Sequence, residues 1–286
     1  MSASTVTLTP VAVRHERPNV TRMLSAFTTL TRRRLALSAR TPRELLVPLL
    51  TPVLFALVIA PALASIGPTI PGLDYMSYAA VGTIGLLIPL NCMFSGIGVI
   101  VDRDSGARRD LLAAPMNRPL IVLANLAAAL TITALQVVVL IAAAALRGAD
   151  LSTSASGVVW FLGAAVLLGV TMYGAAETLS NRIPTLEEYI GALPAVAIVP
   201  FFFAGSLFPI TALPRALAGF ARILPLTHAL AVMRYGLLDH NARGLHDIWG
   251  MSNAPLMAAL SLTVVAAYAV VFTAVALRAF RASVEH

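Results

Sequence analysis

Few residues in this chain of 286 are of a type that could carry out catalysis, and the adjacent pair Glu187 and Glu188 is the first candidate. Adjacent glutamates help to form the active site in one family of intramembrane proteases, where an arginine follows the pair three residues later. The segment Leu186–Ala192 contains no arginine. His228 is the only histidine near a predicted membrane helix that is a candidate metal ligand or general base. The predicted topology puts it on the side of the membrane opposite the glutamates. We therefore do not expect a protease.

The chain also lacks the common motifs that bind nucleotides and metal ions. A phosphate-binding loop of the type G-x-x-x-x-G-K-[ST] needs a lysine, and all twenty basic residues of this chain are arginines. There is no H-E-x-x-H motif and no close group of cysteines and histidines. The single cysteine, Cys92, excludes an internal disulfide. We expect no catalytic, cofactor-binding or metal site in this chain.

The composition is that of a protein embedded in a membrane. Hydrophobic residues make up 58% of the chain and charged residues only 12%, whereas a soluble domain carries about 25% charged residues. The charges lie in short segments between apolar runs rather than on one face of a compact domain, so no nucleic-acid partner is expected. Apolar runs long enough to cross a bilayer predict an all-α membrane protein with six spans, at Leu45–Ala64, Tyr78–Val101, Pro119–Leu146, Gly157–Leu179, Ile190–Phe208 and Pro255–Leu277.

The arginines orient these six spans. An even number of spans places both termini on one side, and fifteen of the twenty arginines lie on that side. Short cytoplasmic segments carry the excess of basic residues, so both termini are expected in the cytoplasm. We expect no cleaved signal peptide, because the arginine-rich N-terminal segment lacks a short apolar core that ends in a small-residue cleavage site. The expected division of the chain is a disordered cytoplasmic tail, a six-span domain and a second cytoplasmic tail, at residues 1–19, 20–280 and 281–286.

The segment 20–40 has the pattern of an interfacial helix. Met23, Leu24, Phe27 and Leu30 share one helical face, and three consecutive arginines follow them. Such a helix can lie in the inner membrane interface, held by the burial of its apolar face and by anionic lipid. The alternative is a frayed cytosolic tail.

The connection between the second and third predicted spans reads VDRDSGARRDLLAAPMNRPL. Asp102, Asp104 and Ser105 are residue types that favour helix N-caps, and Pro115 and Pro119 would end a helix that follows them. The sequence between them predicts a helix of about two turns, with two leucines and three charged residues. A short helix on the cytoplasmic face would offer a rigid contact to a soluble partner. The alternative is a tight turn with solvated charges.

The segment FFFAGSLFPITALPRALAGFARILPLTHALAVMRYG, residues 201–236, is too apolar for an ordinary loop. Its first apolar stripe spans twelve residues, or about 18 Å of helix, well short of a ~30 Å hydrocarbon core. The apolar pattern restarts after Pro225, with His228 and Tyr235 on the opposite face. The two stripes predict short amphipathic helices, broken at the proline, that dip into the bundle from the outer side. The alternative is an extracellular loop.

Polar side chains within predicted spans are costly and are therefore candidates for lining a transport path. They are Asn91, Asn125, Gln136 and Glu177. For the three amides the alternative is a hydrogen bond between helices, worth under ~1 kcal/mol. Glu177 lies near the inner end of its span and could instead snorkel to the interface.

Taken together, the chain resembles the bacterial ABC type-2 transporter permeases, especially the daunorubicin-resistance-like drug and lipid exporters. The resemblance covers roughly residues 20–280 and is carried by the basic N-terminus, the six spans, the acidic–Gly–Leu-Leu–Pro inner loop and LFPITALP…ARILPLTHALAVMRYG. It implies that the inner loop is a coupling helix that docks on a separate cytosolic ATPase, through Asp102, Arg103, Asp104, Gly106, Leu111, Leu112 and Pro115. The outer re-entrant pattern of the family matches Phe208, Pro209, Leu213, Pro214, Pro225, Thr227 and Arg234.

The resemblance also implies partners and a location. This chain would be the permease subunit, paired with a second permease chain in the bacterial cytoplasmic membrane. It would export amphipathic drugs, lipids or lipid-linked compounds, including antibiotics, while ATP and Mg bind to the partner ATPase. Two departures from the family pattern are aspartates where glutamate is common in the inner loop, and no basic residue around Ala124–Asn125. The alternatives are a gradient-driven carrier, which would favour a mid-membrane carboxylate and internal repeats, and a non-transport membrane scaffold, which predicts no co-encoded ATPase.

Overall fold

The computed structural model describes residues 20–59, 61–62, 75–114, 116–151, 153–238 and 242–285. These residues form helices and their connections, without a strand. The elements are α1 (Val20–Arg40), α2 (Pro42–Leu54), the π-helix η1 (Phe55–Ile59), α4 (Tyr75–Asp104), α5 (Ala107–Ala113), α6 (Pro119–Leu146), α7 (Ala155–Arg182), α8 (Leu186–Ala197), α9 (Val199–Phe203), the 3₁₀-helix η2 (Ile210–Ala212), α10 (Arg215–Ala221), α11 (Pro225–Leu237), α12 (Arg243–Trp249) and α13 (Ala254–Glu285).

Five helical segments in the described part of the chain are long and apolar enough to cross a membrane: α4, α6, α7, α8 with α9, and α13. They confirm five of the six predicted spans. The bounds of α6 are those predicted, whereas the fifth span ends at Phe203 rather than at Phe208. It ends early because Gly205 adopts a left-handed backbone with φ 78°, which is accessible to glycine and turns the chain.

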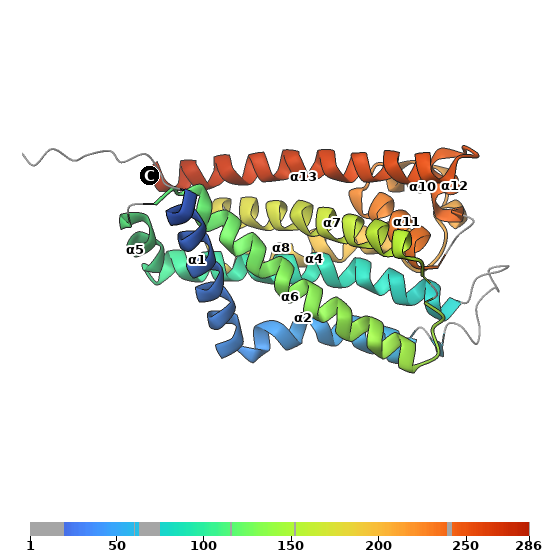
Figure 1. The fold of residues 1–286 in the computed structure, drawn as a ribbon, viewed down its shortest axis with the longest axis horizontal. Coiled ribbons are helices and arrows are strands. Elements are labelled where there is room, and N and C mark those ends of the chain that lie inside the picture. The colour runs from blue at the N-terminus through green and yellow to red at the C-terminus, as the bar shows by residue number, and fades with distance from the viewer. Residues whose placement is uncertain are drawn as a thin grey trace, which may run out of the picture.

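The first predicted span, Leu45–Ala64, is not among these five segments. Most of its described residues belong to α2 and η1, which run without a break from Pro42 to Ile59. Part of the predicted range lies outside the described residues. Figure 1 shows that α2 and η1 nevertheless carry the chain from the end where α1 lies to the end where α4 begins.

The long helices lie side by side along the bundle, and α1 crosses one end of it (Figure 1). The N-terminus of α1 and the C-terminus of α13 both lie at this end of the bundle, beside α5. We call it the inner end, and the opposite end, where α10 and α12 lie, the outer end. Residues 281–285, which belong to the predicted C-terminal tail, form the last turn of α13. Residues 1–19, predicted to be disordered, lie outside the described residues.

The predicted helix at residues 20–40 forms as α1, with the same bounds. Leu30 is buried and Phe27 packs against the core, but Leu24, expected on the same face, is 59% exposed. The buried face of α1 is completed by Arg34 and Ser38 rather than by more apolar residues. α1 is therefore anchored partly by polar contacts, which are described below.

α4 is the central helix of the bundle. Nearly all of its residues from Ser77 to Ile100 are buried, because α2, α6, α7, α8 and α11 all pack against it. Large apolar side chains on the outside of α6 and α13, such as Leu135 and Val270, are more than 60% exposed. An apolar exterior around a core that contains small and polar residues is what a lipid environment favours.

Candidate functional site

The inner loop forms a helix, α5, at the inner end of the bundle (Figure 1). The tight-turn alternative is therefore wrong. The expected capping is also wrong: α4 continues through Asp104, and Gly106, with φ 80°, takes the N-cap position without a side-chain hydrogen bond. Leu111 and Leu112 are half-buried against the core. Pro115, the last residue of the predicted coupling set, lies outside the described residues.

Asp102, predicted to take part in docking, is engaged within the chain. Its two carboxylate oxygens accept hydrogen bonds from Arg33 at 3.3 Å and from Arg34 at 3.4 Å. Arg34 is buried and also donates to the carbonyl oxygen of Ser95 at 3.1 Å. Asp102 and Ser95 both belong to α4, so these contacts hold α1 to the inner half of α4.

Arg103 holds the inner end of α4 to the connection between α7 and α8. Its guanidinium donates to three backbone carbonyl oxygens, those of Ser180, Ile183 and Pro184, at 3.2, 3.1 and 2.7 Å. Its Nε also lies 3.0 Å from Asp104. Among the predicted docking residues, Asp104 is exposed and remains accessible to a partner, whereas Asp102 and Arg103 brace the bundle.

Arg108 is a residue whose role the sequence did not indicate. It lies in α5, among residues predicted to form a charged surface, but it is only 7% exposed. Its Nη2 donates to the hydroxyl of Ser283 at 2.6 Å, and its guanidinium lies 4.8 Å from the ring centroid of Phe280. α5 therefore rests on the inner end of α13.

Glu177 lies in α7, five residues before that helix ends, and is 1% exposed. Snorkelling to the interface is therefore wrong for this residue. The Tyr173 hydroxyl donates to its carboxylate at 2.8 Å, and the amide of Asn181 donates at 3.0 Å. The Oδ1 of Asn181 lies 2.9 Å from the Ser283 hydroxyl. Glu177 is thus linked, through Asn181 and Ser283, to Arg108.

The four path-lining candidates lie on three helices, α4, α6 and α7. Asn91 of α4 donates across the helix interface to Thr133 and to the carbonyl oxygen of Ala129 on α6. Gln136 is also buried on α6, and Asn125 is half-buried near the inner end of the same helix. A path-lining role for any of them stays a prediction.

Asn91→Leu should separate the two interpretations of this residue. We expect the free energy of unfolding to fall by less than about 1 kcal/mol, as for other hydrogen bonds between membrane helices. Melting of the purified protein in detergent would measure this. A variant that kept its stability but lost transport would instead support a role in the path.

The outer segment forms two helices, α10 and α11, bent by 78° at the predicted break. Pro214 precedes α10 and Pro225 is the first residue of α11, positions where proline costs no helical hydrogen bond. The other residues of the matched pattern are Phe208, which is 39% exposed, Pro209 and Leu213, which are half-buried, and Thr227 and Arg234, which are buried.

We call α10 and α11 the outer hairpin, and the bend between them lies partway down the bundle from its outer end. The Tyr268 hydroxyl donates to the carbonyl oxygen of Ile223, next to the bend, at 3.0 Å. Tyr268 lies fourteen residues into α13 from Ala254, so the bend lies about 21 Å from the outer end of that helix. α11 then returns to the outer end, where Gly236 accepts a hydrogen bond from Thr153. The interpretation as an ordinary loop is wrong.

The two helices of the outer hairpin differ in burial. α11 packs against α4, α7 and α13, and His228, predicted on the face opposite the apolar stripe, is only 3% exposed. Helical irregularity at membrane depth is tolerated when protein covers it in this way. α10 and the turn that follows it instead expose apolar side chains, including Phe220 at 49% and Ile223 at 63%.

Arg234 fixes the turn that precedes the outer hairpin. Its guanidinium donates to the carbonyl oxygens of Gly205 at 2.7 Å, Ser206 at 2.8 Å and Tyr78 at 3.3 Å. It also lies 3.5 Å from the ring centroid of Tyr78, whose hydroxyl donates to Gly205 at 2.8 Å. The left-handed turn at Gly205 is thereby attached to the outer end of α4.

The residues considered for proteolysis lie far apart. Glu187 and Glu188 are exposed in the first turn of α8, close to the connection that Arg103 holds at the inner end. His228 hydrogen-bonds to Ser261, in the outer part of α13, and to the carbonyl oxygen of Arg222.

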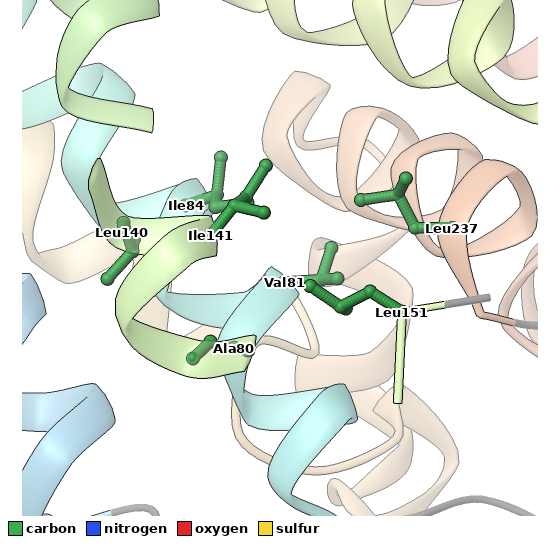
Figure 2. A pocket seen from close by; sticks show the side chains of 8 residues that line it. Ala80, Val81, Ile84, Leu140, Ile141, Leu151 and Leu237 are labelled. Carbon is green, nitrogen blue, oxygen red and sulfur yellow. The ribbon is translucent and has the colours of Figure 1, made fainter. Parts of the chain in front are cut away.

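The interior of the described chain holds small cavities. Figure 2 shows a crevice between α4, α6 and α11, lined by apolar side chains that include Val81, Ile141 and Leu237, and it leaves no room for a water molecule. Two other cavities, one beside Arg34 and Asn91 and one beside Arg234, have room for about 20 Å³ each. None of these three cavities could hold a drug-sized molecule, which needs about 300 Å³ or more.

In a comparison with known protein families, the model described as ABC-2 type transporter matches residues 25–238, a range that includes α5 and the outer hairpin. Comparison with curated proteins gave no match.

Proposed function

The chain belongs to the ABC-2 type transporter family, and from this premise we propose that it is the membrane-spanning half of an ATP-driven exporter. It is a multi-pass permease subunit of an ABC transporter. In our proposal a separate cytosolic ATPase binds ATP and Mg and docks on α5, and a second permease chain completes the complex. Both termini would lie in the cytoplasm, and the bacterial cytoplasmic membrane would be its location.

The geometry of α5 is the observation that carries this proposal. The helix stands on a fixed base, because Arg108 ties it to α13 and Arg103 ties the preceding helix to the α7–α8 connection. Its other charged residues, Arg109 and Asp110, are exposed at the inner end. A rigid, charged helix supported in this way is suited to receive force from a soluble partner.

We infer the position of the cargo path from the size of the cavities within one chain. Because those that we describe are far smaller than a drug or a lipid, we propose that the path lies between two permease chains rather than within one. The apolar exterior, with few charges to bind a polar solute, favours an amphipathic or lipidic cargo. Rigid-body tilting of the helices after ATP binds would open the path outward.

Charge reversal on α5 tests the docking. In the double variant Arg109→Glu, Asp110→Arg both side chains are exposed, so the fold should persist. We expect the affinity for the cognate ABC ATPase, measured by titration of the permease in nanodiscs, to fall about tenfold, or 1.4 kcal/mol. Turnover of ATP in the mixture should lose its dependence on the permease.

Asp150→Arg is the matched control, because it reverses an exposed charge on the connection between α6 and α7 at the outer end. It should bind the ATPase like the parent. Equal affinity of all three proteins for the ATPase, or equal loss in both variants, would refute docking on α5.

A further inference from the structure

The inner joint between α5 and α13 is polar and specific. The Arg108 guanidinium donates to the hydroxyl of Ser283 and lies over the ring of Phe280, both on α13. The same hydroxyl lies 2.9 Å from Asn181 of α7. One small side chain, Ser283, therefore joins three helices, and a displacement of α5 would act on α7 and α13 together.

Between the two ends, α7 and α13 pack closely along their length. A Cβ atom added at Gly174 of α7 would lie 2.8 Å from the backbone carbon of Phe272 on α13, so the two backbones are nearly in contact. Nearer the outer end, the Thr171 hydroxyl lies 3.5 Å from the carbonyl oxygen of Val265. Helices packed this tightly move as one body, since packed interfaces resist continuous deformation.

The outer joint connects this pair of helices to the outer hairpin. The hydroxyl of Ser261 lies 3.2 Å from Nδ1 of His228 and accepts a hydrogen bond from Trp249 at 2.8 Å. Tyr268 donates to Ile223 at the bend between α10 and α11. Gly157 of α7 also lies close to Gly236 of α11. A Cβ atom added at Gly157 would lie 2.1 Å from the carbonyl oxygen of Gly236.

We propose that α13, moving together with α7, transmits the displacement of α5 to the outer hairpin, and that Ser283 is the positioning residue at the inner joint. Figure 1 shows the arrangement: α13 runs the whole length of the bundle, with α5 near one end and α10, α11 and α12 at the other. From Ser283 to Ser261 the helix covers about 33 Å. The outer hairpin would thus respond to nucleotide bound on the opposite side of the membrane. This inference rests on the proposed function, because it needs an ATPase on α5.

A fluorescent label on α10 tests the transmission. Gly219 is exposed and a side chain there would meet no atom within 4 Å, so Gly219→Cys should be tolerated. The native Cys92 is fully buried and would not react with a maleimide in the folded protein. With the cognate ATPase bound, addition of ATP and vanadate should shift the emission of an environment-sensitive label at position 219. Ser283→Ala should reduce this shift about fivefold.

Two further variants separate transmission from stability. Ser283→Thr keeps the hydroxyl and should restore the shift, whereas Thr263→Ala removes an exposed α13 hydroxyl that bonds only within its own helix and should leave the shift unchanged. If the ATPase binds and Ser283→Ala shows the full shift, or the parent shows none, the transmission proposal is wrong. If the ATPase does not bind the parent, the proposed function itself fails.

Discussion

Arg234→Leu should lower the free energy of unfolding by about 3 kcal/mol or more. The wild-type guanidinium is 6% exposed and donates to three backbone carbonyl oxygens, of Gly205, Ser206 and Tyr78. Leucine would remove three hydrogen bonds from a charged donor, each worth about 1.5–3 kcal/mol, although the Gly205 oxygen keeps its bond from the Tyr78 hydroxyl. It would also remove the guanidinium that lies 3.5 Å from the Tyr78 ring centroid.

The single cysteine provides the measurement. Cys92 is 0% exposed, so a thiol-reactive dye reports its exposure as the protein melts in detergent. Arg234→Lys should be intermediate, because an ammonium keeps the charge but not the planar set of donors. Arg215→Leu, at an exposed position on α10, should melt like the parent. If Arg234→Leu melted no earlier than Arg215→Leu, the turn would be held by something other than this guanidinium.

The sequence predicted the long helices well because their signal is local. α6 begins at Pro119 and ends before Arg147 and Gly148, so an uninterrupted apolar run has clear ends at both sides. The break at Pro225 was equally readable, since proline is preferred in the first turn of a helix. In α11 a local pattern predicts only part of the result: its apolar stripe is buried as predicted, but its polar face is buried too, because α4, α7 and α13 surround it.

The roles of individual inner-loop residues could not be read from spacing. Asp102 pairs with Arg34, 68 residues earlier, and Arg108 contacts Ser283, 175 residues later. Nothing in the pattern of charges around α5 distinguishes an arginine that supports the helix, Arg108, from one that faces outward, Arg109. The packing of α5 against α13 determines which of these two arginines is buried.

Gly157→Ala should destabilise the protein although alanine is the better helix former. An added Cβ would lie 2.1 Å from the carbonyl oxygen of Gly236 and 2.7 Å from the hydroxyl of Thr153, so α7 and α11 would have to separate. Overpacking of this kind costs about 1–3 kcal/mol. The gain in helix propensity, about 1 kcal/mol at most, does not offset it, and the cysteine-reactivity melt should show a lower transition temperature.

The same substitution elsewhere in α7 should have the opposite sign. At Gly163 the nearest atoms to an added Cβ belong to the side chain of Leu262, at 3.8 Å, which is an ordinary contact. Gly163→Ala should therefore gain up to about 1 kcal/mol from helix propensity alone. Helix propensity favours alanine at both positions of α7, so opposite signs of the two effects would report the contact of Gly157 with α11. Stabilisation by both would mean that α7 and α11 are not closely joined, and the outer hairpin would then be free to move without α7.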